Sequence, residues 1–231
     1  MKALISDIHA NYAALRAVLA DAEAMGCDEY ICLGDVAGYH ADINECIALL
    51  RSLPRLSLIR GNHDAYLLSG SGCPRSELVS RTLAYQAAVI TPDNLAWLAT
   101  SQEQLRCGLD LFVHGGPENC LEQYIYRVTP SLCRDGLQRL FCGHTHVQVL
   151  YSQERLLFCN PGSVGQPRDG IPQAAYAVLG PSGVQLKRVE YDIAATEHSM
   201  KSAGFPDFYY ANLRMGAQVG GRIDQIFLEG F

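Results

Sequence analysis

The protein has 231 residues, of which 48% are hydrophobic and 18% charged, with a formal net charge of −6. No apolar run approaches the roughly 18 to 20 residues that span a bilayer, and the N-terminus lacks an apolar core of signal-peptide length. We therefore expect a cytoplasmic protein without a membrane partner. The acidic balance also argues against binding to long nucleic acid, which depends on a basic surface.

The nine cysteines do not form a recognisable framework, because their number is odd and no two of them form a Cys-x-x-Cys pair. Several lie inside apolar segments, among them Cys32, Cys142 and Cys159. We interpret them as reduced, buried residues rather than as disulfides or metal ligands.

The first part of the chain alternates predicted strands with predicted helices. In chain order these are a strand at 3–6, a helix at 12–25 capped by Asn11, a strand at 30–33, a helix at 42–53 and a strand at 56–59. This order predicts parallel pairing with right-handed crossovers.

The middle of the chain begins with a Gly- and Ser-rich segment at 69–76, which we predict to be a flexible loop. The elements expected after it are helices at 81–90 and 92–99, strands at 109–113 and 140–142, and a short helix near 130–136. Thr91 is the expected cap of the second helix, with Pro92 at its first position.

After residue 146 the pattern changes to hairpins. Residues 147–151 are expected to pair with 155–159, and residues 174–179 with 184–191. We expect these hairpins to extend a second sheet, and a short helix at 207–214 to precede a loosely ordered end around Gly220 and Gly221. The whole chain is thus predicted as one domain, 1–231. Its expected parts are a metal-ligand core at 1–146, second-sheet hairpins at 147–192, and a C-terminal helix and tail at 193–231.

Five polar clusters each follow one of the predicted strands. They are Asp7-Ile8-His9, Gly34-Asp35, Gly61-Asn62-His63-Asp64, His114-Gly115-Gly116 and Gly143-His144-Thr145-His146. In an open α/β sheet the loops at the carboxyl ends of the strands meet along one edge, where ligands bind. We therefore expect these side chains to converge.

The residue types in these clusters suit a pair of divalent cations. Asp and Asn offer oxygen ligands, neutral imidazole suits Mn, Fe, Ni or Zn, and a carboxylate such as Asp35 can bridge two ions. Two such ions exceed the charge of the two carboxylates, so the site would attract phosphate. Each cluster alone is also compatible with ordinary turn or capping chemistry, but together they favour a dinuclear centre.

This ordered set of motifs resembles the calcineurin-like metallophosphoesterase superfamily. The similarity runs from Asp7 to His146, and residues 160–168 resemble a segment of the bacterial branch that contains small phosphodiesterases and diadenosine-tetraphosphate-hydrolase-like proteins. The resemblance implies an α/β fold, a four-layer α-β-β-α sandwich of two mixed sheets flanked by helices, with the metals at the sheet edges.

The resemblance also implies roles for individual residues. One metal would be held by Asp7, His9 and His146, the other by Asn62, His114 and His144, with Asp35 bridging them. His63 would be the catalytic histidine beside the leaving group, with Asp64 orienting its ring. In the reaction that we predict, Asn62 would also help to stabilise charge on the equatorial oxygens of the phosphoryl group.

Substrate contacts are less well marked in the sequence. Protein phosphatases of the superfamily continue Gly-Asp with Asp-Arg-Gly, whereas this chain reads Gly34-Asp35-Val36-Ala37-Gly38, so their phosphate-binding arginine is absent. Arg168 is a candidate substitute, although it would equally suit a surface position in a hairpin turn. Asn11 is our second candidate for substrate binding.

The predicted reaction is hydrolysis of a phosphodiester or phosphoanhydride bond in a small phosphorylated metabolite or nucleotide. The nucleophile would be a hydroxide held between two metal ions. We favour Mn²⁺ as the metal, because no thiolate ligand is present. His63, as an imidazolium, would assist the leaving group. Two alternatives are a non-catalytic, protein-binding scaffold and a DNA nuclease. A homo-oligomer is possible, and the sequence does not decide it.

Overall fold

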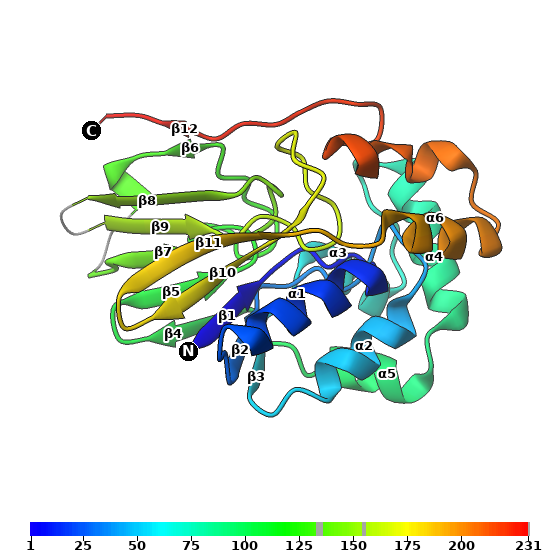
Figure 1. Ribbon diagram of the computed structural model, residues 1–231, viewed down its shortest axis with the longest axis horizontal. Coiled ribbons are helices and arrows are strands. Elements are labelled where there is room, and N and C mark those ends of the chain that lie inside the picture. Colours follow the sequence, from blue (N-terminus) through cyan, green and yellow to red (C-terminus); the bar gives the residue numbers. More distant parts are fainter. Residues whose placement is uncertain (133–135, 154–155, 231) are drawn as a thin grey trace.

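Two five-stranded mixed sheets pack face to face and are flanked by helices (Figure 1), which confirms the predicted fold class. The structure is a computed structural model, and it describes residues 1–132, 136–153 and 156–230.

The first sheet combines the predicted parallel strands with an antiparallel hairpin. In spatial order its strands are β11 (Gly183–Val189), β10 (Ala174–Gly180), β1 (Lys2–Ile5), β2 (Glu29–Cys32) and β3 (Leu56–Leu58). β1, β2 and β3 are parallel, as predicted, and β10 pairs antiparallel with β1. Alternate residues point to opposite faces, so Ala3 and Ile5 face the helices while Leu4 faces the second sheet.

Helices cover the outer face of the first sheet and gather at one side of the molecule (Figure 1). They are α1 (Tyr12–Ala24), α2 (Ile43–Arg51), α3 (Asn62–Ser69), α4 (Glu77–Val89), α5 (Pro92–Leu98) and α6 (Ile193–Ser202). The predicted caps are confirmed, since Asn11 accepts a hydrogen bond from the Ala14 amide and Thr91 accepts one from the Asn94 amide.

The second sheet is also mixed. Its strands, in spatial order, are β4 (Gln104–Cys107), β5 (Asp110–Val113), β7 (Arg139–Phe141), β9 (Leu156–Asn160) and β8 (Val149–Gln153). The three central strands are parallel and the two edge strands antiparallel. Phe112 and Phe141 stack, with ring centroids 4.5 Å apart, in the apolar layer between the two sheets.

The outer face of the second sheet is covered by shorter elements. They are β6 (Arg127–Val128), the 3-10 helix η1 (Pro130–Leu132) and β12 (Phe227–Leu228), which pairs with β6. Ile125, Val128 and Ile226 pack there against the sheet. The predicted helix near 130–136 is thus a short 3-10 turn, and residues 133–135 lie outside the described residues.

The structure corrects one topological prediction. Of the two predicted hairpins, β8–β9 does join the second sheet, but β10–β11 joins the first, where β10 pairs with β1. Both strands of each hairpin are antiparallel as expected. The alternation of apolar residues shows that a strand is half buried, but it does not show which sheet provides the partner.

The C-terminal part also differs from the prediction. α6 (Ile193–Ser202), capped by Asp192, was not predicted, and the expected helix at 207–214 is two 3-10 helices, η2 (Asp207–Tyr209) and η3 (Ala211–Met215). The eight described cysteines are free thiols, and Cys133 lies outside the described residues. Among the described residues, no helix has the length and apolarity needed to cross a bilayer.

Candidate metal centre and substrate cavity

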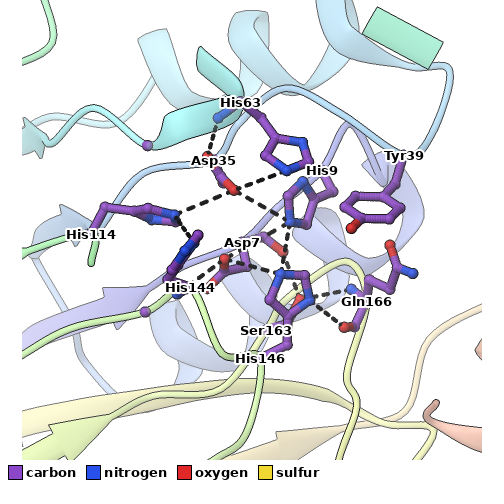
Figure 2. Close-up of polar contacts among 12 residues, drawn as sticks. Asp7, His9, Asp35, Tyr39, His63, His114, His144, His146, Ser163 and Gln166 are labelled. Atoms are coloured by element: carbon purple, nitrogen blue, oxygen red, sulfur yellow. Dashed lines mark hydrogen bonds and ion pairs between the residues drawn. The ribbon is translucent and has the colours of Figure 1, made fainter. Parts of the chain in front are cut away.

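The five polar clusters meet where the carboxyl ends of the strands of both sheets lie together (Figure 2). Asp7 and Asp35 follow β1 and β2 of the first sheet, whereas His114 and His144 follow β5 and β7 of the second. The site therefore lies at a common edge of the sandwich.

The backbone at the site is strained. Among the described non-glycine residues, those with positive φ include five of the predicted ligands: Asp7, His9, Asp35, His144 and His146, with φ between 51° and 68°. Asp and His tolerate this left-handed conformation better than most residues. Such strain persists only where the surrounding structure enforces it, and it concentrates at functional sites.

Gly143 allows the two sheets to approach each other at this point. A Cβ on Gly143 would lie 1.9 Å from Ser6 Oγ and 2.7 Å from Asp7 Oδ2. The loop that carries His144 therefore needs glycine at its first position to pack against Asp7.

The first group of candidate ligands consists of Asp7, His9 and His146, which are fully buried or nearly so. His146 Nε2 lies 3.2 Å from Asp7 Oδ1 and 3.0 Å from His9 Nε2. This is the set that the sequence assigned to one metal.

The second group surrounds His114. Its Nε2 lies 3.1 Å from Asn62 Oδ1, 3.0 Å from His144 Nδ1 and 3.4 Å from Asp35 Oδ2. Asp35 lies between the two groups, because its Oδ2 is also 3.7 Å from His9 Nε2. Asp35, the residue predicted to bridge two metals, is thus within reach of both groups.

The hydrogen bonds of the imidazole rings test whether this arrangement suits cations. The Nδ1 atoms of His9 and His146 lie 2.7 Å from the carbonyl oxygens of Ala37 and Gln166. Carbonyls only accept, so each Nδ1 carries the proton and each Nε2 presents a lone pair. Two lone pairs facing each other at 3.0 Å repel unless a positive charge lies beside them.

His114 is held in the same way, with Nδ1 3.0 Å from the Leu33 carbonyl oxygen and Nε2 turned toward the site. Carbonyl acceptors of this kind orient the ring of a ligating histidine. The donor atoms therefore fit two divalent cations with mixed nitrogen and oxygen ligands.

The carboxylates of the centre are ionised. Burial opposes the ionisation of Asp35, but the imidazoles of His114 and His63 outweigh it, so the pKa of Asp35 lies well below its usual range. Burial alone would lower the pKa of His114, yet Asp35 and Asp7 raise it to about 9. This protonated imidazole offsets the buried negative charge, which is the role that a bound cation would take over.

His63 lies beside the first group, with Nε2 3.9 Å from Asp35 Oδ2. Its Nδ1 has no hydrogen-bond partner among the described residues and faces Gly38, where a Cβ would lie only 2.2 Å away. Burial lowers the pKa of His63 to about 4, so its ring is neutral near pH 7 in the metal-free protein. The structure thus gives no support to an imidazolium at this position before substrate binds.

Asp64 does not orient the ring of His63, contrary to the prediction. Its Oδ2 accepts hydrogen bonds from the amides of Asp35 and Gly61, and its Oδ1 accepts one from the amide of Ala37, each at 2.9 Å. Burial and the nearby Asp35 raise the pKa of Asp64 to about 7, against the effect of these amide donors. Asp64 therefore fixes the loop that carries Asp35.

Asn11 is also not a substrate contact. Its side chain is fully buried, with Oδ1 accepting from the Ala14 amide and the Thr196 hydroxyl and Nδ2 donating to the Gly165 carbonyl. These bonds join α1 to α6 and to the loop after β9. The sequence had identified its capping role correctly and its substrate role wrongly.

Arg168 lies in a cavity next to the metal centre. The cavity measures about 540 Å³ and is also lined by Asn62, His63 and Tyr39. Arg168 is only 6% exposed, which rules out a surface position in a turn, and its Nη2 donates to the Tyr39 hydroxyl at 2.7 Å.

Arg168 has an unsatisfied charge. In the described part of the chain its Nε has no hydrogen-bond partner, and no carboxylate lies within ion-pair distance. A buried cation without a counterion is costly, so this arrangement suits an anionic ligand.

Several residues of the site were not identified from the sequence. Tyr39 stacks beside His63 with ring centroids 5.3 Å apart, and Tyr124 stacks on His144 at 3.7 Å. Ser163 donates to the Asp7 carbonyl, and Asn160 donates to the Gly143 carbonyl. Asn160 and Ser163 could have been identified because they follow shortly after a predicted strand, as the other site residues do. No local sequence pattern marks Tyr39 or Tyr124.

The chain was compared with protein-family profiles, and the calcineurin-like phosphoesterase superfamily domain matches residues 1–182. The chain belongs to this superfamily. An uncharacterized protein of Methanocaldococcus jannaschii is 32% identical over 242 residues, which cover 94% of this chain and 98% of that protein.

Solved structures support the same assignment. A metallophosphoesterase from Sphaerobacter thermophilus is 31% identical, with 93% of this chain and 98% of that chain covered and a TM-score of 0.81. A hypothetical protein from Pyrococcus horikoshii, 20% identical over 94% of this chain and 100% of its own, has a TM-score of 0.83 and shows the shared fold. These findings confirm the resemblance read from the motifs.

Proposed function

We propose that the protein is a phosphoesterase dependent on two divalent metal ions, which hydrolyses phosphodiester or phosphoanhydride bonds of small phosphorylated metabolites or nucleotides. The observation that carries this proposal is the pair of candidate ligand groups on either side of Asp35, beside a cavity that is lined by Asn62, His63 and Arg168. The superfamily membership supports the same reaction class.

The ligands fall into the two groups described above. Asp7, His9 and His146 would hold one ion, Asn62, His114 and His144 the other, and Asp35 both. When bound, the two ions supply Lewis acidity toward the phosphoryl oxygens and lower the pKa of a bound water. We favour Mn²⁺, because the donor set contains nitrogen and oxygen atoms and no thiolate.

The residues around the centre orient the substrate. Asn62 lines the cavity and would donate to a phosphoryl oxygen, while Arg168, hydrogen-bonded to Tyr39, would neutralise the phosphate charge. His63 lies at the border of the ligand groups and the cavity. As a neutral ring it can donate one hydrogen bond to the leaving oxygen, and a bound phosphate would favour its protonation.

Two other functions were considered. A protein-binding scaffold does not need a buried cluster of potential metal ligands with strained backbone, and the presence of such a cluster here supports an enzyme. A nuclease needs a basic track for a long polyanion, whereas this chain has a net charge of −6. We therefore propose an enzyme that acts on a small substrate in the cytoplasm.

The test is hydrolysis of bis(p-nitrophenyl) phosphate by metal-free protein to which Mn²⁺, Fe²⁺, Ni²⁺ or Zn²⁺ is added. We expect turnover that depends on added metal and is greatest with Mn²⁺. Absence of turnover with every metal would favour a scaffold. Faster cleavage of oligonucleotides than of dinucleotides would favour a nuclease.

A further inference from the structure

Three arginines line the cavity beside the candidate metal ligands. Besides Arg168, the cavity is lined by Arg75 and Arg222, and none of its described lining residues is acidic. In a protein with a net charge of −6, this concentration of arginines is a local exception. A cavity with one sign of charge attracts ligands of the opposite sign.

The two outer arginines come from different parts of the chain. Arg75 lies in the loop between α3 and α4, and its guanidinium is 5.2 Å from the ring centroid of Tyr124. Arg222 lies between η3 and β12, beyond the region matched by the superfamily profile. The C-terminal segment that follows η3 thus supplies one wall of the cavity.

Asp224 holds this wall in place. It is only 8% exposed, and its carboxylate pairs with the Arg222 Nε at 3.0 Å and accepts hydrogen bonds from the Tyr126 hydroxyl and the Gln218 amide. Its backbone amide donates to the Arg168 carbonyl at 2.7 Å. One buried acid therefore connects the C-terminal wall to Arg168.

Both outer arginines are partly oriented by acids that lie outside the described lining. Glu122 pairs with Arg75, which also donates to the Tyr124 hydroxyl, and Asp224 pairs with the Nε of Arg222. The guanidinium groups of both arginines are themselves partly exposed, so these ion pairs contribute little to stability. They fix the direction of each guanidinium, which favours recognition of an anion.

We propose that Arg75 and Arg222 form a second anion subsite, which binds a negatively charged group of the substrate on the far side of the scissile bond. This inference rests on the proposed function, and it names the substrate class: phosphate compounds that carry a further phosphate, such as phosphoanhydrides, rather than esters of neutral alcohols. In the reaction, the oxygen of water forms a bond to the attacked phosphorus. The bond from that phosphorus to the bridging oxygen breaks, and the departing phosphate keeps the electron pair while the proton of water passes to solvent or to the product.

The test compares two substrates in Arg222→Gln and Arg75→Gln. Bis(p-nitrophenyl) phosphate carries one negative charge, and diadenosine tetraphosphate carries several. We expect each variant to raise KM for diadenosine tetraphosphate about fivefold. KM for the aryl diester should stay within about twofold of the wild-type value. Arg81→Gln is the matched control, because Arg81 is exposed, is paired with Glu77 on α4 and lies outside the cavity lining.

Binding of a compound that is not turned over provides a second measurement. Calorimetry with α,β-methylene-ADP should show affinity about fivefold weaker for Arg222→Gln than for the wild-type protein, and unchanged for Arg81→Gln. The subsite would be overturned if the variants raised KM equally for both substrates. It would also be overturned if KM for diadenosine tetraphosphate and the affinity for the analogue were both unchanged. If the wild-type protein turned over neither substrate, the proposed function would fail, and the analogue alone would decide whether the subsite exists.

Discussion

The metal centre and the outer wall of the cavity lie side by side but are built differently. The centre consists of buried side chains in short motifs, with left-handed backbone and rings fixed by carbonyl acceptors. The wall consists of more exposed arginines on separate segments, with Arg222 paired to Asp224 and Arg75 to Glu122. Under the proposed function, the reaction would depend on short local motifs, and the choice of substrate would depend on how distant segments pack.

The largest effect is expected from removing the residue shared by both ligand groups. Asp35→Ala should lose at least one metal ion per chain and lower kcat/KM by roughly 10³, because the two ions lose their common ligand. Elemental analysis measures the metal content per chain, and steady-state kinetics measure kcat/KM. The control is Asp93→Asn, because Asp93 is exposed on α5. If Asp35→Ala still bound two ions per chain, Asp35 would not be the bridging ligand.

A second change tests whether the close packing at Gly143 is required. Gly143→Ala places a Cβ 1.9 Å from Ser6 Oγ, so we expect a loss of roughly 2–3 kcal/mol in the free energy of unfolding and weaker metal binding. Gly180→Ala is the control, since its Cβ would meet only the flexible side chain of Met1. Denaturation curves with wild-type stability for Gly143→Ala would contradict this close packing.

The buried histidines also predict how stability depends on pH. Burial lowers the pKa of His40 to about 4, and its Nδ1 donates to the His9 carbonyl at 2.8 Å. The folded pKa lies below the unfolded value, so the unfolded state binds more protons between the two. Stability contributed by neutral His40 is therefore full above about pH 6.5 and falls as pH drops toward 4, by up to about 3 kcal/mol.

Urea unfolding of the metal-free protein at several pH values measures this dependence. In His40→Asn, whose amide can replace the Nδ1 donor, the free energy of unfolding should fall less steeply between pH 6.5 and 4. Identical slopes for the variant and the wild-type protein would show that His40 does not contribute.

The smallest effect in the centre is expected at His63, which is not among its assigned ligands. His63→Ala should retain two metal ions and lose roughly 10² in kcat, mostly for esters with poor leaving groups. Measuring kcat for a series of aryl diesters with different leaving groups shows how the loss depends on the leaving group. Full activity with every leaving group would remove His63 from the mechanism.

Much of the fold and most of the centre could be predicted from the sequence, because both depend on local signals. Strands with a polar residue at the carboxyl end predicted the convergence of Asp7, Asp35 and His114, and capping residues located α1 and α5. The start of α3 at Asn62 was missed, because its first turn consists of site residues rather than an apolar face.

The errors concern contacts between distant segments. The pairing of β10 with β1, the bonds from Asp64 to the Asp35 loop and those from Asn11 to Thr196 each depend on tertiary packing, which local periodicity does not encode. The same is true of the cavity wall formed by Arg222, since no motif marks it.

The central claim is that two cations lie between the ligand groups and share Asp35. Anomalous diffraction at the manganese edge, from crystals grown with Mn²⁺, tests it most directly. We predict two peaks, one among Asp7, His9 and His146 and one among Asn62, His114 and His144. A single peak, or peaks away from these side chains, would contradict the account.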